Sequence, residues 1–261
     1  MGAGAMEGKL EREFLSSTRI SLALARDDLL AQHRLQPWDL GPLLQGLLME
    51  QMGAACAERL HGMPFNPYSQ HCEVDGGHIV WVVNALTDEA REAIVQPVLQ
   101  ASELRIKKLD VPLRIEGFQE TRITRRSLAD LVHGGGTSRF ILGFVTPTAF
   151  KSDGAYQTIP SARLVYQNLI MHYGHVFDAD READSDTVEY LASHTRIAKY
   201  SLHSRSFLLA GKRIPAFMGN MTVDVGGPQP LRGFAHMLFR FGEFGGVGIK
   251  TSMGMGGFSV A

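Results

Sequence analysis

A glycine-rich stretch near the end of the chain, residues 245–257, is the feature that most restricts the fold. Six of its thirteen residues are glycine, and Lys250, Thr251 and Ser252 stand among them. Glycine adopts positive φ and lets other groups approach the main chain closely. Consecutive N–H groups in such a loop can form a concave anion site, to which Lys250 would add a charge. A second interpretation stays open: a glycine-rich turn into a final strand at 257–260.

Two familiar phosphate-binding loops are excluded by the order of residues in this stretch. A Walker loop has Gly-Lys-Ser/Thr directly ahead of a helix, whereas Ile249 separates Gly248 from Lys250, and too few residues follow for a helix. A dinucleotide-binding fingerprint has G-x-G-x-x-G between a strand and a helix. Neither that spacing nor a following helix is present.

Length and composition set broad limits on the class of protein. The 261 residues suit one large domain or two of about 125 residues. The formal net charge of −1 argues against a uniformly basic nucleic-acid-binding chain, but bases gather at 122–126 and 196–213, so a local basic face is compatible with it. Two cysteines make no disulfide framework and fit a cytoplasmic protein. No apolar run has the length of a membrane span.

The predicted elements follow the same order in each half of the chain. In the first half we expect strands at 18–24, 65–73, 78–84, 104–109 and 113–118, and helices at 39–60 and 87–99, with a hairpin turn at 75–77. In the second half we expect strands at 140–145, 199–209, 217–225 and 257–260, helices from 160 and at 229–241, an inserted helix at 187–197, a loop at 146–151 and a turn at 211–213.

This order predicts an α+β protein of two tandem ferredoxin-like βαββαβ domains that closes with the glycine-rich loop. We expect a flexible leader at 1–8, an N-terminal domain at 9–133 and a C-terminal domain with the inserted helix at 137–261. The glycines at 134–136 are the expected joint. A segment at 122–126 is expected to be a basic connector, followed by a helical turn at 128–133.

Several short stretches together resemble one family, the CRISPR-associated endoribonucleases of the RAMP superfamily, which process precursor CRISPR RNA at its repeats. The matching stretches span almost the whole chain and occur in the family's order, at 44–47, 60–61, 67–69, 146–151, 217–222 and 244–256. The last is the most specific, because it resembles the family's C-terminal glycine-rich signature. The resemblance implies tandem ferredoxin-like folds of the RAMP or RRM type.

The resemblance also implies an activity. A 2′-hydroxyl attacks the adjacent phosphate without a metal ion or cofactor, which leaves a 2′,3′-cyclic phosphate and a 5′-hydroxyl end. The partner is then CRISPR repeat RNA, together with other subunits of a CRISPR effector complex in some settings; a homodimer is left open. Such chemistry needs a base, an acid and cationic or N–H stabilisation of the transition state, and it requires RNA because DNA lacks the nucleophile.

His61 is the first candidate for acid–base catalysis. Histidine titrates near neutrality, and His61 lies at the predicted end of a helix, before Gly62, where relatives often carry a histidine. A histidine that only complements the helix dipole is the alternative. His33, Tyr68 and Ser69 are further candidates for the cleft. Met49 occupies the position of a tyrosine found in some relatives, and no lysine follows His61 before Lys107.

Residues for RNA contact come from the basic segments and the terminal loop. Phosphate contacts supply much of nucleic-acid affinity, so as a set we expect contacts from Arg122, Arg125, Arg126, Lys199, Arg205, Lys212, Arg213, Gly246, Gly248, Lys250, Thr251, Ser252, Gly254 and Gly256. His203 lies in the same basic segment. His172 and His175 have helical spacing without a third ligand, so no metal site is predicted.

Two other functions stay open at this point. A RAMP-fold subunit could hold guide RNA without cutting it. A two-domain ferredoxin-like protein outside CRISPR systems could bind a small phosphate ligand in the terminal loop.

Overall fold

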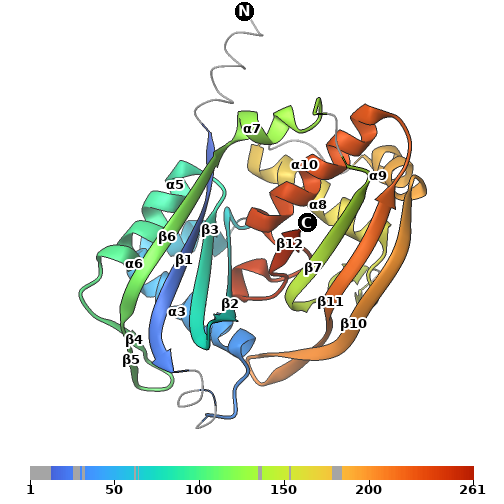
Figure 1. The fold of residues 1–261 in the computed structure, drawn as a ribbon. Helices are drawn as coiled ribbons and strands as arrows, with labels where there is room; N and C mark the ends of the chain where they lie inside the picture. The colour runs from blue at the N-terminus through green and yellow to red at the C-terminus, as the bar shows by residue number, and fades with distance from the viewer. Residues whose placement is uncertain are drawn as a thin grey trace, which may run out of the picture.

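The computed structural model describes residues 13–25, 30, 33–61, 63, 65–134, 137–152, 154–177 and 184–261. It contains two four-stranded antiparallel sheets that stand side by side (Figure 1). The first has the strand order β2-β3-β1-β6 and the second the order β10-β11-β7-β12. In both sheets the first strand of the unit pairs with the third and the fourth, which is the ferredoxin-like arrangement. The fold predicted from the sequence is confirmed.

The first sheet is formed by β1 (Phe14–Ala25), β2 (Tyr68–Asp75), β3 (His78–Ala85) and β6 (Ile115–Thr124). β1 is central because it pairs with both β3 and β6. β2 and β3 are joined by Gly76 and Gly77, whose φ values are 56° and 86°. Two positive φ values in a two-residue hairpin loop match the twist of the flanking strands, so the hairpin expected at 75–77 is confirmed.

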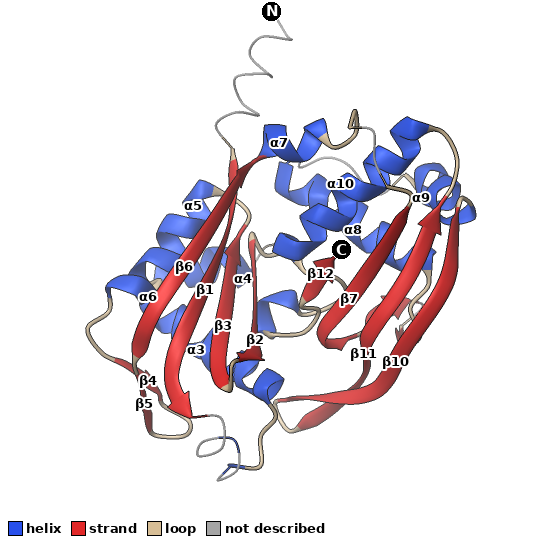
Figure 2. Ribbon diagram, in the orientation of Figure 1, coloured by secondary structure: helices blue, strands red, loops and turns tan. Residues whose placement is uncertain are grey.

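Helices cover one face of this sheet, as Figure 2 shows. They are the short η1 (Pro37–Leu40), α3 (Gly41–Gln51), α4 (Ala54–His61), and the continuous run α5 (Asp88–Ala90), η2 (Arg91–Val95) and α6 (Gln96–Gln100). Leu44, Leu48 and Ile94 pack against Ile20 and Trp81 from the sheet. The single helix expected at 39–60 is divided, because Gly53 has φ of 80° and interrupts the helical backbone.

The strands predicted at 104–109 and 113–118 are placed differently. A small hairpin of β4 (Leu104–Ile106) and β5 (Val111–Leu113) comes first, and β6 then runs to Thr124. Arg122 therefore lies on a strand, and the expected basic connector at 122–126 is wrong. The helix α7 (Arg125–Asp130) begins immediately, because the Thr124 hydroxyl accepts a hydrogen bond from the Ser127 N–H and caps it.

The second sheet is formed by β7 (Arg139–Thr148), β10 (Thr195–Leu209), β11 (Lys212–Val225) and β12 (Phe258–Val260). The final strand expected at 257–260 is confirmed and pairs with β7. The segment at 146–151 is not a loop: β7 extends to Thr148, and β8 (Phe150–Ser152) pairs with β9 (Ala155–Gln157). The turn between β10 and β11 is made by Ala210 and Gly211, both with positive φ, so Lys212 and Arg213 begin β11 instead of forming the turn.

The helices α8 (Ala162–Phe177), α9 (Ser185–Ser193) and α10 (Gln229–Gly245) pack with the second sheet. Phe140, Phe144, Leu169 and Phe241 lie in this second core. Leu15, Leu86 and Leu128, from before the expected joint at 134–136, also belong to it. The two halves are therefore packed together through shared apolar contacts, although the first half also has a core of its own. The domain boundaries at 133 and 137 stay a prediction. Residues 1–8, 135 and 136 lie outside the described residues.

Candidate functional site

The seam between the two halves is built around β2, the edge strand of the first sheet. Five of its side chains, Tyr68, Ser69, Gln70, His71 and Cys72, are buried. The last carbonyls of any helix have no partner within the helix, and β2 and its neighbour β3 supply partners to α10. The Ser69 hydroxyl donates to the Phe244 oxygen at 2.7 Å, while the Asn84 amide donates to the Glu243 oxygen at 3.2 Å and to Ser69 Oγ at 2.9 Å.

Gln70 joins the same strand to the glycine-rich loop. Its Nε2 donates to the oxygens of Gly41 and Ser252, at 2.8 and 3.1 Å, and its Oε1 accepts from Trp81 Nε1 at 2.9 Å. A Cβ on Gly41 would lie 2.4 Å from the Met253 oxygen. Glycine is required there because the loop of one half lies directly on the first turn of α3 in the other half.

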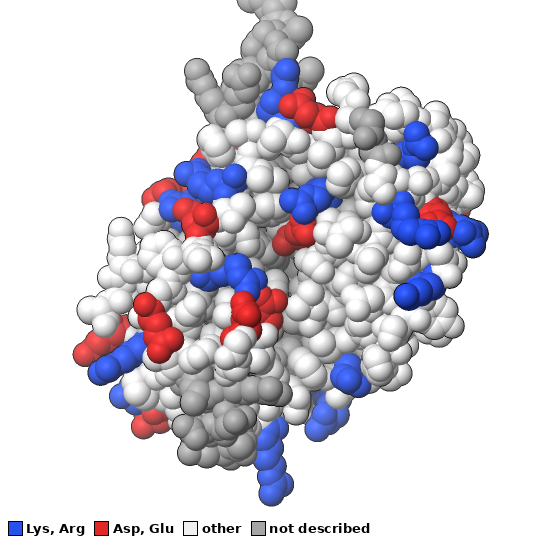
Figure 3. All heavy atoms as spheres, in the orientation of Figure 1, with Lys and Arg blue, Asp and Glu red and all other residues white. Residues whose placement is uncertain are grey.

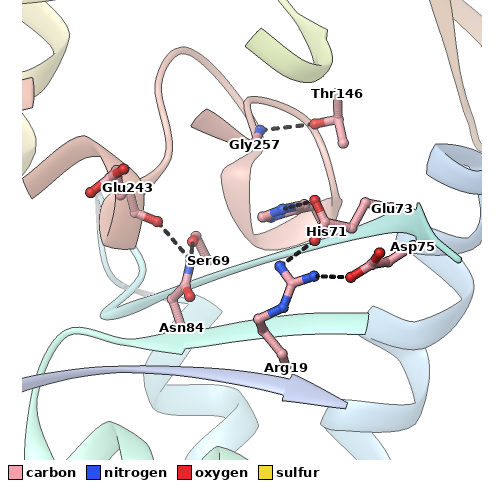
Figure 4. A network of polar contacts seen from close by, with 9 residues as sticks. All are labelled: Arg19, Ser69, His71, Glu73, Asp75, Asn84, Thr146, Glu243 and Gly257. Carbon is pink, nitrogen blue, oxygen red and sulfur yellow. Dashed lines mark hydrogen bonds and ion pairs between the residues drawn. The ribbon is translucent and has the colours of Figure 1, made fainter. Parts of the chain in front are cut away.

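Figure 4 shows the polar side of this seam. Arg19 on β1 forms ion pairs with Glu73 and Asp75, and His71 Nε2 lies 4.0 Å from Glu73 Oε2. Burial lowers the pKa of His71 to about 4, although the Glu73 carboxylate opposes this and Arg19 adds to it. His71 is therefore neutral at pH 7 and is packed against Gly257, where a Cβ would lie 2.9 Å from the imidazole.

The glycine-rich loop differs from the open anion cradle that its sequence predicts. Most of its N–H groups donate to the protein itself: Val247 to the Gly256 oxygen, Gly248 to Asn168 Oδ1, Ile249 to the Ala149 oxygen, Gly256 to the Pro147 oxygen and Gly257 to Thr146 Oγ1. A Cβ on Gly256 would lie 2.2 Å from the Val247 oxygen. These N–H groups are therefore used within the protein, and the glycines there serve close packing of the loop.

The middle of the loop reaches the surface. Lys250 is exposed and has left-handed backbone dihedrals, with φ of 57° and ψ of 36°. Thr251 is partly exposed, whereas Ser252 is buried and accepts a hydrogen bond from Asn66 Nδ2 at 3.2 Å. Of the loop residues predicted to contact RNA, Lys250 and Thr251 have accessible side chains, while Ser252, Gly246, Gly254 and Gly256 are buried.

The helix that carries His61 ends beside this loop. α4 ends at His61, whose side chain lies outside the described residues. Four residues later, Phe65 stacks on His172 of α8 with 5.0 Å between ring centroids, and its ring lies 4.7 Å from that of His175. Phe65 lines two pockets, one of about 380 Å³ with Lys250 and one of about 220 Å³ with Leu60. The His61 end of α4, α8 and the loop thus meet in one region.

The other catalytic candidates are placed differently. Tyr68 is fully buried, and burial raises the pKa of its hydroxyl to about 12, against opposing contributions from Gln45 and Ser252. Ser69 is buried with both hydrogen-bonding roles used inside the protein. Neither side chain reaches solvent, so their predicted contact with the cleft does not fit the structure. His33 is exposed.

The predicted basic residues form two separate groups. Arg122, Arg125 and Arg126 lie at the end of β6 and in α7 and are paired with Asp88, Glu13 and Asp130. The other group, Lys199, Arg205, Lys212 and Arg213, lies on the β10–β11 hairpin. The hairpin also carries Arg196, which pairs with Asp224, the hairpin's single acidic residue. On the face in Figure 3, acidic side chains gather mainly over the N-terminal half, while basic ones continue down the C-terminal side.

The hairpin is anchored to the glycine-rich loop. Phe207, Ile214 and Ala216 near its tip pack with Ala149 and Met255, and Trp38 from the first half packs against the same cluster. Lys212 and Arg213 are thereby held on a fixed arm close to the seam. Sequence reasoning missed this cluster because its members come from four distant segments, none of which has a distinctive pattern.

Comparison with known proteins identifies the family. The family described as CRISPR-associated endoribonuclease Cas6 matches residues 142–258. A CRISPR-associated endoribonuclease Cas6 from Streptococcus thermophilus is 35% identical over 224 residues, which cover 85% of this chain and 91% of that protein. The chain belongs to the Cas6 family. A Cas6 from Mycobacterium tuberculosis is also 35% identical, over 93% of this chain and 78% of its own length.

Solved Cas6 structures share the fold. The chain superposes on the Cas6 (TTHA0078) product complex with a TM-score of 0.73 and 21% identity, over 95% of this chain and 99% of that one. For Thermus thermophilus Cas6 (TTHB231) the TM-score is 0.69 at 17% identity, over 95% and 99% of the two chains. The family expected from the glycine-rich tail and the tandem ferredoxin-like fold are both confirmed.

Metal-binding clusters and membrane-spanning helices are both missing from the part of the chain that the structure describes. Within the described residues, no three His, Cys, Asp or Glu side chains lie close enough together to hold a metal ion. Within the same part of the chain, no helix is both long and apolar enough to cross a membrane.

Proposed function

We propose that this Cas6 cleaves precursor CRISPR RNA within its repeats and thereby produces mature guide RNAs in the cytoplasm. The observation that carries the proposal is the 35% identity to Cas6 endoribonucleases over most of the chain, the match to S. thermophilus Cas6 covering 91% of that protein. The TTHA0078 relative was solved both as a product complex and as a substrate mimic complex. RNA is accordingly the partner, and in some settings other CRISPR subunits join it.

The proposed reaction is transesterification inside the RNA. A base removes the proton from the 2′-hydroxyl, whose oxygen attacks the adjacent phosphorus while the bond to the 5′-oxygen breaks and that oxygen takes a proton. The products are a 2′,3′-cyclic phosphate and a 5′-hydroxyl. Neither a metal ion nor a cofactor enters the proposed step. His61 is assigned as the general acid or base, since positioned histidines perform this role near neutral pH.

Two features of the seam support this assignment. Phe65, four positions after His61, is fixed against His172 and His175 of α8. Lys250 faces the pocket on the other side of Phe65 and can offer positive charge to the phosphate as negative charge develops. His33, which is exposed, remains a second candidate for proton transfer.

Cleavage of labelled cognate repeat RNA in EDTA tests the proposal. One cut is expected, and it should disappear when the nucleotide before the scissile phosphate is 2′-deoxy. His61→Ala should lower the cleavage rate by about 10²- to 10⁴-fold with little change in RNA affinity, whereas His78→Ala, at the exposed start of β3, should cleave normally. Full cleavage by His61→Ala would remove the role assigned to His61.

The alternative is a RAMP-fold subunit that holds guide RNA without cutting it. One structural relative is described as a RAMP protein that binds different RNA substrates, and the chain superposes on it with a TM-score of 0.57. Tight binding of repeat RNA without any cleavage by the wild-type protein would favour this alternative.

A further inference from the structure

A pocket of about 380 Å³ lies between the glycine-rich loop and α8. Its volume falls in the range of about 300–1,000 Å³ that is usual for small-ligand sites. Its apolar lining residues are Phe65, Phe150, Leu164, Met171 and Ile249, and its polar or small ones include Asn66, Lys151, Gln167, Asn168, Lys250 and Thr251. The lining is thus partly apolar and aromatic, and it carries two cations.

The aromatic part of the lining is held in place before any ligand arrives. Phe65 is supported from behind by His172 and His175, and the His172 imidazole lies 3.4 Å from the Asn66 oxygen. Burial lowers the pKa of His172 to about 4, against the effect of that hydrogen bond and with a small addition from His175. A neutral, packed ring therefore supports Phe65 at neutral pH. Phe150 is buried and stacks on Phe217.

The polar side is held equally firmly. Asn168 uses both ends of its amide on Gly248: Oδ1 accepts from the N–H at 2.7 Å and Nδ2 donates to the oxygen at 3.3 Å. This pair of bonds fixes the loop to α8 just ahead of Lys250. The exposed ammonium groups of Lys151 and Lys250 form no ion pair with any residue the structure describes.

An apolar, partly aromatic lining together with two lysines that form no ion pair with the described residues matches the chemistry of a nucleotide. Bases stack on aromatic side chains with little dependence on sequence, and lysines bind the phosphates. The pocket also lies near the proposed site of cleavage. Because a chain extends at most about 3.6 Å per residue, the Cα atoms of His61 and Phe65 are separated by no more than about 14 Å, roughly two nucleotides of extended RNA.

We propose that this pocket binds one unpaired nucleotide of the RNA, adjoining the scissile phosphate, with its base against Phe65 and Met171 and its phosphate on Lys151 and Lys250. The proposal rests on the proposed function, which supplies the RNA. By binding this nucleotide, the pocket would keep its base out of the stacked strand. The strand is then held at a fixed distance from His61.

Abasic substitution tests this assignment through binding. Cognate repeat RNA is made 2′-deoxy at the cut, so that it is not consumed, and a single abasic site is placed at each position around the cut in turn. Affinity for the wild-type protein should fall about tenfold or more at one position within two nucleotides of the cut. Met171→Trp, which fills the pocket, should weaken binding of intact RNA by a similar factor.

The decisive measurement is whether the abasic site in the RNA and Met171→Trp in the protein affect the affinity independently of each other. Met171→Trp should have little further effect on RNA that lacks that one base, because both changes remove the same contact. Tyr190→Trp, on the exposed face of α9, should leave all affinities unchanged. If the reductions in affinity caused by the abasic site and by Met171→Trp multiply, the proposal is overturned. It is also overturned if no position in the abasic scan is sensitive.

A second variant keeps the test open if Met171→Trp does not fold. Lys250→Gln should weaken the binding of intact RNA and of RNA abasic at that position equally, since the phosphate is present in both. It should also lower the salt dependence of binding. Lys108→Gln, an exposed lysine outside the pocket, is its control. No effect of Lys250→Gln on affinity would overturn the phosphate assignment. Coupled binding without cleavage of all-ribose RNA would leave the pocket assigned and remove the nuclease function instead.

Discussion

The Ser69 hydroxyl lies 2.7 Å from the main-chain oxygen of Phe244, so a residue of β2 caps the last turn of α10 across the seam. The bond is buried, and Ser69 also accepts from Asn84. It is one of several contacts in which polar side chains of the first half satisfy main-chain groups of the second. The two halves are therefore joined by specific hydrogen bonds as well as by apolar packing.

Ser69→Ala should lower the free energy of unfolding by about 1–3 kcal/mol, because the Phe244 oxygen would stay buried without that donor. The comparison is Ser193→Ala, whose hydroxyl donates to the Tyr190 oxygen at an exposed position and should change stability by less than about 0.5 kcal/mol. Urea unfolding of both variants provides the measurement. Equal stabilities would show that the seam does not depend on this bond.

Gly256→Ala should be more damaging than its size suggests. Gly256 has φ of 69°, and a Cβ there would lie 2.2 Å from the Val247 oxygen, so we expect a loss of at least about 2 kcal/mol. Gly46→Ala, in α3, has open space around the new methyl group and should be neutral or stabilising by up to about 1 kcal/mol. Thermal unfolding distinguishes the two, and a stable Gly256→Ala protein would contradict the packing described for the loop.

Sequence patterns predicted the elements well where the local signal was strong. Alternation in β3 and the glycines at 76–77 identified the first hairpin, and the periodic apolar residues of α10 identified the last helix. Patterns failed where a single backbone angle decides the outcome. Gly53 divides α3 from α4, and Ala210 with Gly211 makes the turn that was expected at 211–213.

The candidate site was harder to predict because its parts meet only in the folded chain. Lys250 was identified as the cation of the glycine-rich loop and His61 as a histidine at a helix end that fits the resemblance. The stacking of Phe65 on His172, however, joins residues more than 100 positions apart. The glycine-rich loop was interpreted as an open anion cradle. The sequence shows that its glycines permit close approach to the main chain, but it does not show whether an anion or another part of the chain makes that approach. In this fold the approaching groups are Gly41, Ala149 and Val247 of the same chain.

Two buried histidines should make the protein less stable in mild acid. His71 and His172 are neutral when folded, with pKa values lowered by burial to about 4, whereas in the unfolded chain they would titrate near 6.5. The unfolded state therefore binds protons first, and stability should fall as pH drops from about 6.5 to 4, by up to about 3 kcal/mol per histidine. Above pH 7 neither contributes a slope.

His172→Gln should remove part of this pH dependence. The measurement is the free energy of unfolding of the variant and the wild type at several pH values between about 4.5 and 7.5, which brackets the unfolded-state titration of histidine. The variant's curve should be flatter over that range, whatever its stability at the upper end. His78→Gln, at the exposed start of β3, should retain the wild-type slope. An unchanged slope in His172→Gln would show that His172 is not neutral and buried in the native protein.

The β10–β11 hairpin should account for part of the electrostatic affinity for RNA. Lys212 and Arg213 are exposed, and the packing of Phe207 and Ile214 beneath them holds the hairpin against the loop. Removing one cation that binds a phosphate should lower the slope of log K against log salt by about 0.7–0.9. The double change Lys212→Gln and Arg213→Gln should therefore reduce that slope by about 1.5 and weaken RNA binding most at low salt.

Arg163→Gln, which removes a cation paired with Glu189 on the α8–α9 surface, is the matched control and should leave the slope unchanged. Equal slopes for the double variant and the wild type would place the RNA elsewhere on the protein.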